Sequence, residues 1–509
     1  MVDFGGDIMA MISVVNLTFK YDGSYDNIFE NVSFNIDTDW KLGFVGRNGR
    51  GKTTFLNLLM GKYEYSGNIH ANVNFDYFPF TVPDEEKNAY QIAYDLDNNS
   101  EVWRLEKEVN LMNMNPDLLE RPFKELSKGE QTRILLAMLF IKDNNFLLID
   151  EPTNHLDSEA RMIVANYLKN KKGFILVSHD RKFIDICVNH ILSINKANIE
   201  IQQGNFSTWW ENRQRQDNFE LAENEKLKRD ISRLTDSAKQ SANWAGQIEA
   251  SKYNMRGDIL QDKGYIGHKS AKMMKRSLNA QARKEKAIVD KSKLLKNVET
   301  IEPLKMTPLP FTGDVLIAVN NLAINYGENT LFRDIFFNVE PGDRIQLKGA
   351  NGSGKSSLIK LLLGEDISYS GELYIANNLK ISYISQDTSY LKGKLETFAA
   401  EHNIDETQFK SILRKLGFER IQFEKNIENF SEGQKKQVLI AKSLCEEANI
   451  YIWDEPLNYI DVISRTQIED VILNYAPTLI FVEHDETFSE KIATKVVTIH
   501  QEEVLRKRR

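Results

Sequence analysis

Residues 46–53 read GRNGRGKT, and residues 349–356 read GANGSGKS. Three further motifs follow each copy in the same order. They are LSKGEQ and FSEGQK, then IDEPTNHLD and WDEPLNYID, and finally VSHD and VEHD. Corresponding residues lie 303 to 305 positions apart, as the pairs Lys52 and Lys355 or His179 and His484 show. Because four ordered motifs share one offset, we infer that the same domain occurs twice in the chain.

Each copy alternates segments of strand and helix character. Strand-like sequence precedes the glycine-rich motif, an apolar helix follows it, and a β-branched, apolar strand later ends in Asp-Glu. This alternation predicts an α/β fold with a largely parallel core sheet in each copy. The expected divisions are an N-terminal extension at 1–10 (disordered, or preceding a natural start at Met11), a first repeat at 11–205, a linker at 206–305, a second repeat at 306–502 and a short basic tail at 503–509.

The composition is that of an ordinary globular protein. The 509 residues are 41% hydrophobic and 27% charged, which is enough apolar material for sizeable cores without disulfides. Cys187 and Cys445 are far apart and lack metal-ligand spacing, so we expect reduced core cysteines. No apolar run approaches the ~18 residues of a membrane helix, and the N-terminus lacks the regions of a signal peptide. These features predict a cytoplasmic protein without a membrane segment.

The two glycine-rich motifs fit the pattern GxxxxGK[ST] of a phosphate-binding loop. Glycines let the backbone curl so that N–H groups point at phosphate oxygens, and the following helix directs its positive end to the same place. Lys52 and Lys355 should hold the β- and γ-phosphates, and Thr53 and Ser356 should reach Mg²⁺. A glycine turn before a helix is the alternative for one motif alone. The predicted nucleotide contacts are Gly46, Asn48, Gly49, Gly51, Lys52, Thr53 and Thr54, and Gly349, Asn351, Gly352, Gly354, Lys355, Ser356 and Ser357.

Two acidic pairs end the buried strands. Asp150 and Asp454 stand at the C-terminal ends of apolar runs, where an aspartate can meet the metal ion. Glu151 and Glu455 follow directly, and a carboxylate in that position can orient or deprotonate an attacking water. A helix-capping or salt-bridging acid is the alternative. ATP and Mg²⁺ are therefore the expected ligands.

The complete pattern resembles the ABC ATPases over both repeats. Asp-Glu-Pro, then Asn-x-[LI]-Asp, then [SE]-His-Asp carries the resemblance, with LSKGE and FSEGQ in place of the signature LSGGQ. The resemblance implies that two ATP molecules are sandwiched head to tail within one chain. Ser127 and Gly129 would then complete the Lys355 site, and Ser431 and Gly433 the Lys52 site.

The resemblance also implies roles for further side chains. His179 and His484 match switch histidines that contact the γ-phosphate, and Asp157 and Asp461 match the D-loop. Tyr21 and Tyr326 occupy the place of an aromatic ring that stacks on adenine, although a core tyrosine is a fair alternative. The family expects a metal-coordinating glutamine, and Gln386 fits in the second repeat.

Two departures from the family pattern concern the ATP sites. The first repeat has Phe80 where the second has Gln386, and a phenylalanine cannot coordinate Mg²⁺ or orient water. The Lys52 site is therefore expected to hydrolyse ATP more slowly. Lys128 and Glu432 each replace a signature glycine and place an unusual pair of charges near the sandwich.

The linker is basic although the whole chain carries a net charge of −8. Residues 206–300 hold 20 Lys and Arg against 13 Asp and Glu, so this segment carries +7 and the remainder about −15. Apolar residues at spacings of three and four predict two long amphipathic helices packed antiparallel, with a turn near 246–266. A basic hairpin on an acidic body suggests a surface for a polyanion. A solvated spacer between the repeats is the alternative.

Two fused repeats without a membrane segment resemble the ABC-F family of ribosome-binding proteins. That resemblance implies a bacterial ribosome as partner, with the linker on the tRNA exit-site side near large-subunit RNA and peptidyl tRNA. It implies no membrane or DNA partner, and a functional monomer. The linker residues expected to contact ribosome or tRNA are Lys252, Tyr253, Met255, Arg256, Ile259, Leu260, Lys263, Lys269, Lys272, Lys275 and Arg276.

The first repeat leaves no room for the long arm of many ABC-F proteins. Phe80 and Ser127 are 47 residues apart, against 45 between Gln386 and Ser431. This resembles the antibiotic-resistance branch, and segments such as GFILVSHDR and YIWDEPLNYIDV resemble its Lsa/Vga type. The implied function is protection from lincosamides, streptogramin A compounds and pleuromutilins. The alternatives are a housekeeping ABC-F factor that relieves stalled ribosomes and, in another class, the ATPase of a drug exporter.

Overall fold

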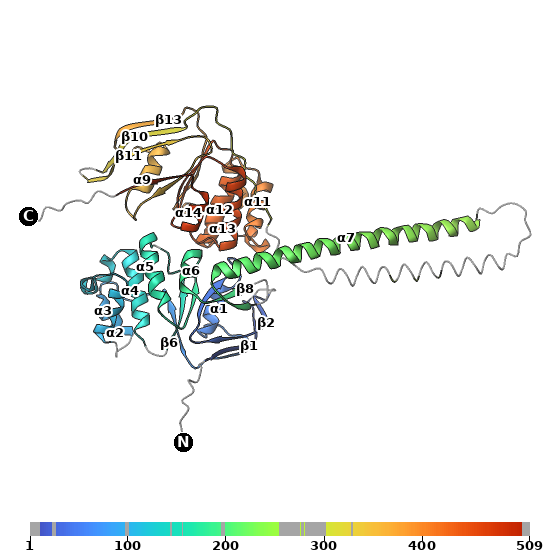
Figure 1. The fold of residues 1–509 in the computed structure, drawn as a ribbon, viewed down its shortest axis with the longest axis horizontal. Helices are drawn as coiled ribbons and strands as arrows, with labels where there is room; N and C mark the ends of the chain where they lie inside the picture. The colour runs from blue at the N-terminus through green and yellow to red at the C-terminus, as the bar shows by residue number, and fades with distance from the viewer. Residues whose placement is uncertain are drawn as a thin grey trace, which may run out of the picture. The chain divides into compact units, whose positions relative to one another are not determined.

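The computed structural model describes most of both repeats and the first half of the linker. The described residues are 11–22, 27–96, 101–142, 145–154, 156–194, 199–253, 302–326 and 329–500, together with Lys275, Asn279 and Arg283. Within these residues the chain forms the predicted α/β architecture twice, which confirms the fold class (Figure 1).

The first repeat contains a six-stranded sheet and a smaller antiparallel sheet. The six strands lie in the order β5-β6-β7-β3-β8-β9, and all neighbours are parallel except β8 and β9. The small sheet has the order β2-β1-β4. The elements are β1 Met11–Phe19, β2 Phe29–Asp37, β3 Lys41–Val45, α1 Lys52–Leu59, β4 Ser66–His70, β5 Asn74–Phe78, α2 Ala89–Leu96, α3 Val102–Leu111, α4 Lys128–Phe140, β6 Asn145–Asp150, α5 Ser158–Lys169, β7 Phe174–Val177, α6 Arg181–Cys187, β8 His190–Ile194 and β9 Ile199–Gln203, with short 3₁₀ helices η1 Pro116–Glu120 and η2 Phe123–Glu125.

The second repeat has a five-stranded parallel sheet in the order β14-β15-β16-β12-β17 and a small sheet in the order β11-β10-β13. The elements are β10 Ile317–Tyr326, β11 Asn329–Val339, β12 Arg344–Lys348, α9 Lys355–Leu362, β13 Tyr369–Ile375, β14 Ile381–Ile384, α10 Leu395–Glu401, α11 Glu406–Lys415, α12 Glu432–Cys445, β15 Ile450–Asp454, α13 Val462–Tyr475, β16 Leu479–Val482, α14 Glu486–Ile492 and β17 Lys495–Thr498, with η3 Arg420–Glu424 and η4 Ile427–Asn429.

Strand β15 shows why these sequences form central strands. Its residues IYIWD are all buried, because the sheet is covered on both faces. Tyr451 and Trp453 point into one hydrophobic core, and Ile450 and Ile452 point into the other. An apolar run that would be unfavourable on a half-exposed strand is therefore required here. The parallel strands also bring their C-terminal ends, and the loops that follow them, to one edge of each sheet.

The linker begins with the single long helix α7, Phe206–Tyr253 (Figure 1). Its 48 residues correspond to about 72 Å of helix at 1.5 Å per residue. Pairs at i and i+4 connect Arg213 with Asp217, Arg215 with Glu211 and Arg229 with Glu225, which stabilises a largely polar helix. Residues Trp210–Thr300 belong to a unit of their own, and both repeats belong to the other.

Residues 246–253, the start of the predicted turn, are instead the last residues of α7, so any turn lies beyond Tyr253. The rest of the predicted turn and nearly all of the return arm lie outside the described residues. On the return arm, the structure describes Lys275, Asn279 and Arg283, which are helical and exposed. Their spacing of four places them along one helix face. The antiparallel hairpin therefore stays a prediction. In the part of the chain that the structure describes, no helix is both long and apolar enough to cross a membrane.

Candidate active sites

Each phosphate loop depends on glycines that no other residue could replace. Gly51 and Gly354 precede α1 and α9 in the left-handed region, with φ of 93° and 97°. A Cβ atom would lie 2.6 Å from Ile28 at Gly51 and 2.9 Å from Phe332 at Gly354. The loops are therefore fixed between a strand end and a helix N-terminus, as an anion-binding loop requires.

The two loop lysines bind their own loops. The Nζ of Lys52 donates to the carbonyls of Gly46, at 2.7 Å, and Arg47, at 3.2 Å. The Nζ of Lys355 donates to the carbonyls of Gly349 and Ala350, both at 2.8 Å. Burial lowers the pKa of both ammonium groups. The ammonium groups of Lys52 and Lys355 are therefore each enclosed by their own glycine-rich loop, where phosphate is expected to bind.

The aspartates that end β6 and β15 lie beside the loop hydroxyls. Thr53 Oγ1 donates to Asp150 Oδ2 at 3.1 Å, and Tyr77 donates to the same oxygen at 2.9 Å. In the second repeat, burial raises the pKa of Asp454 and a hydrogen bond from Ser356 opposes this shift. The buried Oδ1 of Asp454 has no hydrogen-bond partner. An unsatisfied carboxylate oxygen beside a hydroxyl is a donor set that fits a hard cation such as Mg²⁺.

Glu151 and Glu455 both have left-handed backbone conformations, with φ of 51° and 48°. Such a conformation costs a non-glycine residue about 1–3 kcal/mol and is concentrated at functional sites. Both residues remain attached to the sheet, because their N–H groups donate to the carbonyls of Val177, at 2.8 Å, and Val482, at 3.0 Å.

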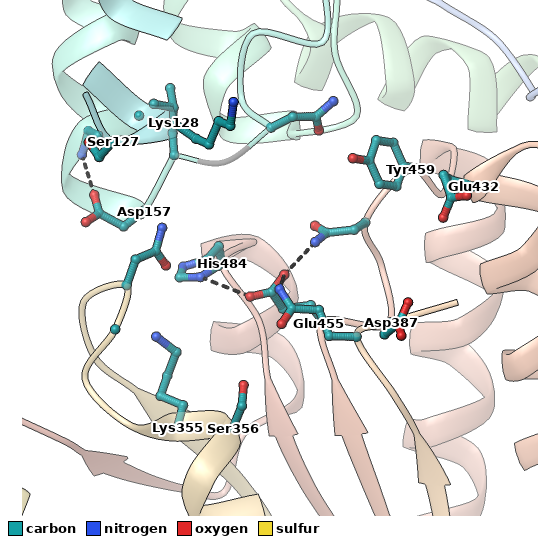
Figure 2. Close-up of a pocket in the computed structure, with 18 of the residues that line it drawn as sticks. Ser127, Lys128, Asp157, Lys355, Ser356, Asp387, Glu432, Glu455, Tyr459 and His484 are labelled. Atoms are coloured by element: carbon teal, nitrogen blue, oxygen red, sulfur yellow. Dashed lines mark hydrogen bonds and ion pairs between the residues drawn. The ribbon is translucent and has the colours of Figure 1, made fainter. Parts of the chain in front are cut away.

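The surroundings of the two glutamates differ. Oε2 of Glu455 accepts from Gln386 Nε2 at 2.9 Å and from Asn458 Nδ2 at 2.7 Å, and His484 Nε2 lies 3.8 Å from Oε1 (Figure 2). Glu151 has His179 Nε2 at 3.2 Å from Oε1. Burial, reinforced by Asp150, raises the pKa of Glu151 to about 8. The carboxylate of Glu455 is thus held by two amide donors.

His179 and His484, the predicted switch histidines, are both buried and tend toward the neutral form. Burial lowers the pKa of His484 to about 4 and also lowers the pKa of His179. Asp180 and Asp485 follow them and receive buried ion pairs from Arg161, at 3.2 Å, and Arg465, at 2.7 Å. These pairs fix the ends of the two histidine loops.

The strand register shows that Phe80 and Gln386 occupy corresponding positions in the two repeats. Phe78 pairs with Ile149 in the first repeat, and Ile384 pairs with Trp453 in the second. Ile149 and Trp453 both directly precede the metal-side aspartate, so positions two residues beyond Phe78 and Ile384 correspond. The hydrogen bond that Gln386 donates to Glu455 has therefore no counterpart from Phe80.

A cavity of about 1070 Å³ forms the Lys355 site between the two repeats. This volume is large enough for a nucleotide, since ligand pockets typically measure about 300–1,000 Å³. Figure 2 shows Lys355 and Ser356 across the cavity from Ser127 and Lys128. The predicted residues brought together here are Ser127, Gly129, Asp157, Asn351, Gly352, Gly354, Lys355, Ser356, Ser357, Gln386, Glu455 and His484.

The Lys52 site is closed by direct contact between the repeats. Asn48 Nδ2 donates to the carbonyl of Tyr459 at 2.6 Å, and the N–H of Asn48 donates to Asp461 at 3.4 Å. A Cβ atom on Gly433 would lie 3.3 Å from Asn48 Nδ2. The phosphate loop of the first repeat thus lies against the signature and D-loop of the second.

The signature serines begin helices. Ser127 accepts from the N–H of Glu130 and Ser431 from that of Gln434, and each helix begins with a capping box. Lys128 donates to Gln131, while Glu432 accepts from Thr388 and pairs with Lys435. Lys128 and Glu432 both line the cavity, and each has its partners within its own repeat.

The two adenine candidates are only partly described. The hydroxyl of Tyr21 lies 2.7 Å from Thr54 Oγ1, and its ring is 40% exposed beside Phe19 and Tyr63. One edge of Tyr21 thus touches the phosphate loop while the ring remains accessible. Tyr326 ends β10, but its side chain lies outside the described residues, so adenine stacking stays a prediction for both.

Most predicted ribosome contacts also lie outside the described residues. Lys252 and Tyr253 end α7, and Lys275 is helical and exposed. The predicted contacts that lie outside the described residues are Met255, Arg256, Ile259, Leu260, Lys263, Lys269, Lys272 and Arg276.

Sequence reasoning did not single out Asn458 or Lys436. Asn458 holds Glu455, and Lys436 lines the cavity of the Lys355 site. Asn458 could have been found from the duplication, because Asn154 occupies the same place in the first repeat. Lys436 could have been found only by comparing the two repeats for positions that differ, since Thr132 occupies the corresponding position in the first repeat.

A family model described as "ABC transporter" matches residues 29–154 and 332–458, one segment in each repeat. The chain belongs to the ABC ATPase family. It is accordingly an ATP-binding enzyme that hydrolyses ATP, and its predicted place in the ABC-F branch is confirmed.

The ribosome protection protein VmlR of Bacillus subtilis is 28% identical over 96% of this chain and 87% of its own length. The energy-dependent translational throttle protein EttA of Haemophilus influenzae is 26% identical over 92% of this chain and 89% of its own length. An archaeal ribosome recycling factor, ABCE1, solved with a ribosomal stalk protein, has a TM-score of 0.60 at 19% identity over 95% of this chain and 87% of its own. The structural likeness supports the fold of this ABC ATPase.

Proposed function

We propose that this ABC-F ATPase binds the bacterial ribosome and protects it from antibiotics that act at the peptidyl-transferase centre. The observation that carries the proposal is the likeness to a ribosome protection protein over 96% of the chain. The basic composition of the linker supports it, because ribosomal RNA is a polyanion. The proposed drug classes are lincosamides, streptogramin A compounds and pleuromutilins, and the proposed location is the cytoplasm.

In the proposed cycle, ATP binding closes the repeats and promotes ribosome engagement, and hydrolysis promotes release. The repeats at 11–205 and 306–502 would supply the sandwich, and the linker at 206–305 would contact tRNA and large-subunit RNA. Two inter-repeat sites are well suited to this coupling, because each nucleotide would touch residues of both repeats. Ser127 and Gly129 lie on the same cavity as Lys355, and Gly433 lies beside Asn48.

In the Lys355 site, the carboxylate of Glu455 would act on the attacking water. Glu455 orients a water molecule toward the γ-phosphate and accepts its proton as the new P–O bond forms and the bond to the β-phosphate oxygen breaks. Gln386 and Asn458 fix the carboxylate oxygen that does not face the histidine, and His484 stands beside the other. When bound, Mg²⁺ would neutralise phosphate charge beside Ser356 and Asp454.

A drug-susceptibility series tests this function. Cells that express the chain should show raised minimum inhibitory concentrations for lincomycin, tiamulin and a streptogramin A. Cells that express Lys52→Ala/Lys355→Ala at equal protein level should not, because the loop lysines cannot then hold phosphates. Unchanged susceptibility with the intact chain would contradict drug protection.

A housekeeping factor that acts on stalled ribosomes is the second candidate, favoured by the likeness to the translational throttle protein EttA. It predicts ribosome binding and a growth defect on deletion without a change in drug susceptibility. An exporter ATPase predicts that the chain fractionates with membranes. Ribosome and membrane fractions from the same lysate separate these outcomes.

A further inference from the structure

Lys436 is a buried lysine next to the Lys355 site. It lies on α12 one turn beyond the signature serine, and only 3% of the residue is exposed. Its Nζ donates to the carbonyl of Ser385 at 2.9 Å. Because a lysine is almost never fully buried without partners, this contact indicates a site built around the ammonium group.

The ammonium lies among the carboxylates of the second repeat. Glu483, Glu455 and Asp454 each raise the pKa of Lys436, against burial, which lowers it and is the larger effect. Glu483 is itself buried and accepts from the N–H of Leu457, at 2.7 Å, and from that of His484, at 3.1 Å. The lysine therefore offsets negative charge around Glu455, while its Nζ donates to the carbonyl of Ser385.

The carbonyl that Lys436 holds belongs to the residue before Gln386. Gln386 donates in turn to Oε2 of Glu455 at 2.9 Å. A short path thus leads from Lys436 through Ser385 and Gln386 to the carboxylate that is proposed to orient water. Gln386 stands in an exposed loop after β14, and this loop receives an anchoring hydrogen bond from a buried helix through Lys436.

The first repeat keeps the glutamate, as Glu151, but lacks the other parts of this path. Thr132 replaces Lys436, and its hydroxyl donates to the carbonyl of Lys128 in its own helix at 2.9 Å. Pro79 and Phe80 replace Ser385 and Gln386, and Ser178 replaces Glu483. The lysine, its charge partner and the glutamine therefore occur together in one repeat and are absent together from the other.

We propose that Lys436 is a positioning residue of the Lys355 site that fixes Ser385 and Gln386 so that Gln386 holds Glu455 for hydrolysis. The inference concerns the ATPase reaction itself and is independent of which partner the chain serves. The proposal implies that the Lys355 site hydrolyses ATP faster than the Lys52 site, because only the Lys355 site has the contact between Lys436 and Ser385.

The test uses the full chain with Glu151→Gln, so that the remaining turnover comes from the Lys355 site. In this background, Lys436→Met should lower kcat by roughly tenfold to hundredfold, because a small misplacement of a reacting group has effects of that size. KM and the dissociation constant for a fluorescent ATP analogue should stay within about twofold, since Lys436 is not expected to touch phosphate.

Two further variants separate positioning from folding. Lys436→Arg keeps a cationic donor for the Ser385 carbonyl and should recover most of kcat. Lys442→Met, on the same helix but in an ion pair with Glu446, removes equal charge and should leave kcat unchanged. Gln386→Ala should lower kcat in the same way, and adding Lys436→Met should lower it little further, because the two residues act on one path.

Several results would overturn the proposal. They are a kcat for Lys436→Met within twofold of the background, a full additional loss on top of Gln386→Ala, or no recovery with Lys436→Arg when all variants melt at the same temperature. Loss of ATP binding with kcat preserved would also overturn it, since that would make Lys436 a nucleotide ligand.

Discussion

At the scale of single residues, the two predicted ATP sites share their glycines, lysines and acids but differ in the side chains that contact the proposed catalytic glutamate. Glu455 accepts hydrogen bonds from Gln386 and Asn458. Glu151 lies beside His179, and Phe80 occupies the position that corresponds to Gln386. These differences concern the surroundings of the glutamate and leave the lysines and glycines of the phosphate loops in place. They are therefore expected to change rate more than ATP affinity.

Single Glu→Gln variants should reveal this asymmetry. Loss of a general base costs a site about 10²-fold or more, so each variant reports the turnover of the other site. Glu455→Gln should reduce total ATP turnover more than Glu151→Gln, because it removes the site that has Gln386. Steady-state phosphate release at saturating ATP measures both, and equal losses or the reverse order would refute the asymmetry.

The buried carboxyl of Glu151 should make stability depend on pH. Its folded pKa of about 8 exceeds the unfolded value of about 4.3, so the unfolded state loses its proton first. The folded state therefore loses stability as pH rises from about 4.3 to 8, by at most about 1.4 kcal/mol per pH unit, and no further above that.

Glu151→Gln removes this titration. In nucleotide-free protein, the variant should gain thermal stability over the wild type as pH rises from 5 to 8, with a constant difference above 8.5. Calorimetry across this range measures the difference, and Lys172→Gln provides an exposed control. A pH-independent difference would contradict the raised pKa.

At the scale of elements, the predictable parts were those that local pattern determines. The apolar runs before Asp150 and Asp454 predicted buried parallel strands, and the spacing of four motifs predicted two repeats. The contacts of Lys436 with Ser385 and of Asn48 with Tyr459 join residues 51 and 411 positions apart. Contacts between residues so far apart in the sequence depend on how the helices and loops pack in three dimensions. The spacing of motifs along the sequence could therefore not reveal them.

The return arm of the linker is the element with the clearest charge prediction. Lys275 and Arg283 are exposed, helical and two turns apart, so they can face one strand of RNA. Replacing both with Gln should weaken ribosome association and reduce the slope of log K against log salt by roughly 1.5, because about 0.7–0.9 is lost for each phosphate contact. Ribosome pelleting at several salt concentrations measures the slope.

The matched control is on α7. Arg215 and Arg229 are equally exposed but already paired with Glu211 and Glu225, so Gln at both positions should change the slope less. Equal effects from the two double variants would argue for a general charge effect and against a defined contact.

The predicted tip at 246–266 includes the last residues of α7, which ends at Tyr253. Replacing this segment with a short glycine-rich turn should leave ATP turnover within about twofold, because no nucleotide motif lies there. Drug protection should be lost, since the tip alone is expected to reach the drug site. Full protection by the shortened chain, measured at equal expression, would favour the spacer interpretation.

At the scale of the whole molecule, the two sites differ in how the repeats meet. Asn48 contacts Tyr459 and Asp461 directly at the Lys52 site, whereas the Lys355 site retains a cavity large enough for a nucleotide. Ion pairs between Arg181 and the buried Glu469, and between Lys182 and Glu486, also join the repeats. The signature and phosphate-loop residues of both sites therefore face one another in this structure.

The most direct test of a ribosome-binding ATPase is sedimentation of the Glu151→Gln/Glu455→Gln double variant with ribosomes in the presence of ATP. The variant should bind ATP, fail to hydrolyse it and accumulate in the ribosome fraction, while the wild type dissociates after turnover and remains mostly in the supernatant. Adding Lys52→Ala and Lys355→Ala should abolish the accumulation. If the double variant binds ATP yet stays in the supernatant, or fractionates with membranes, the proposed function is contradicted.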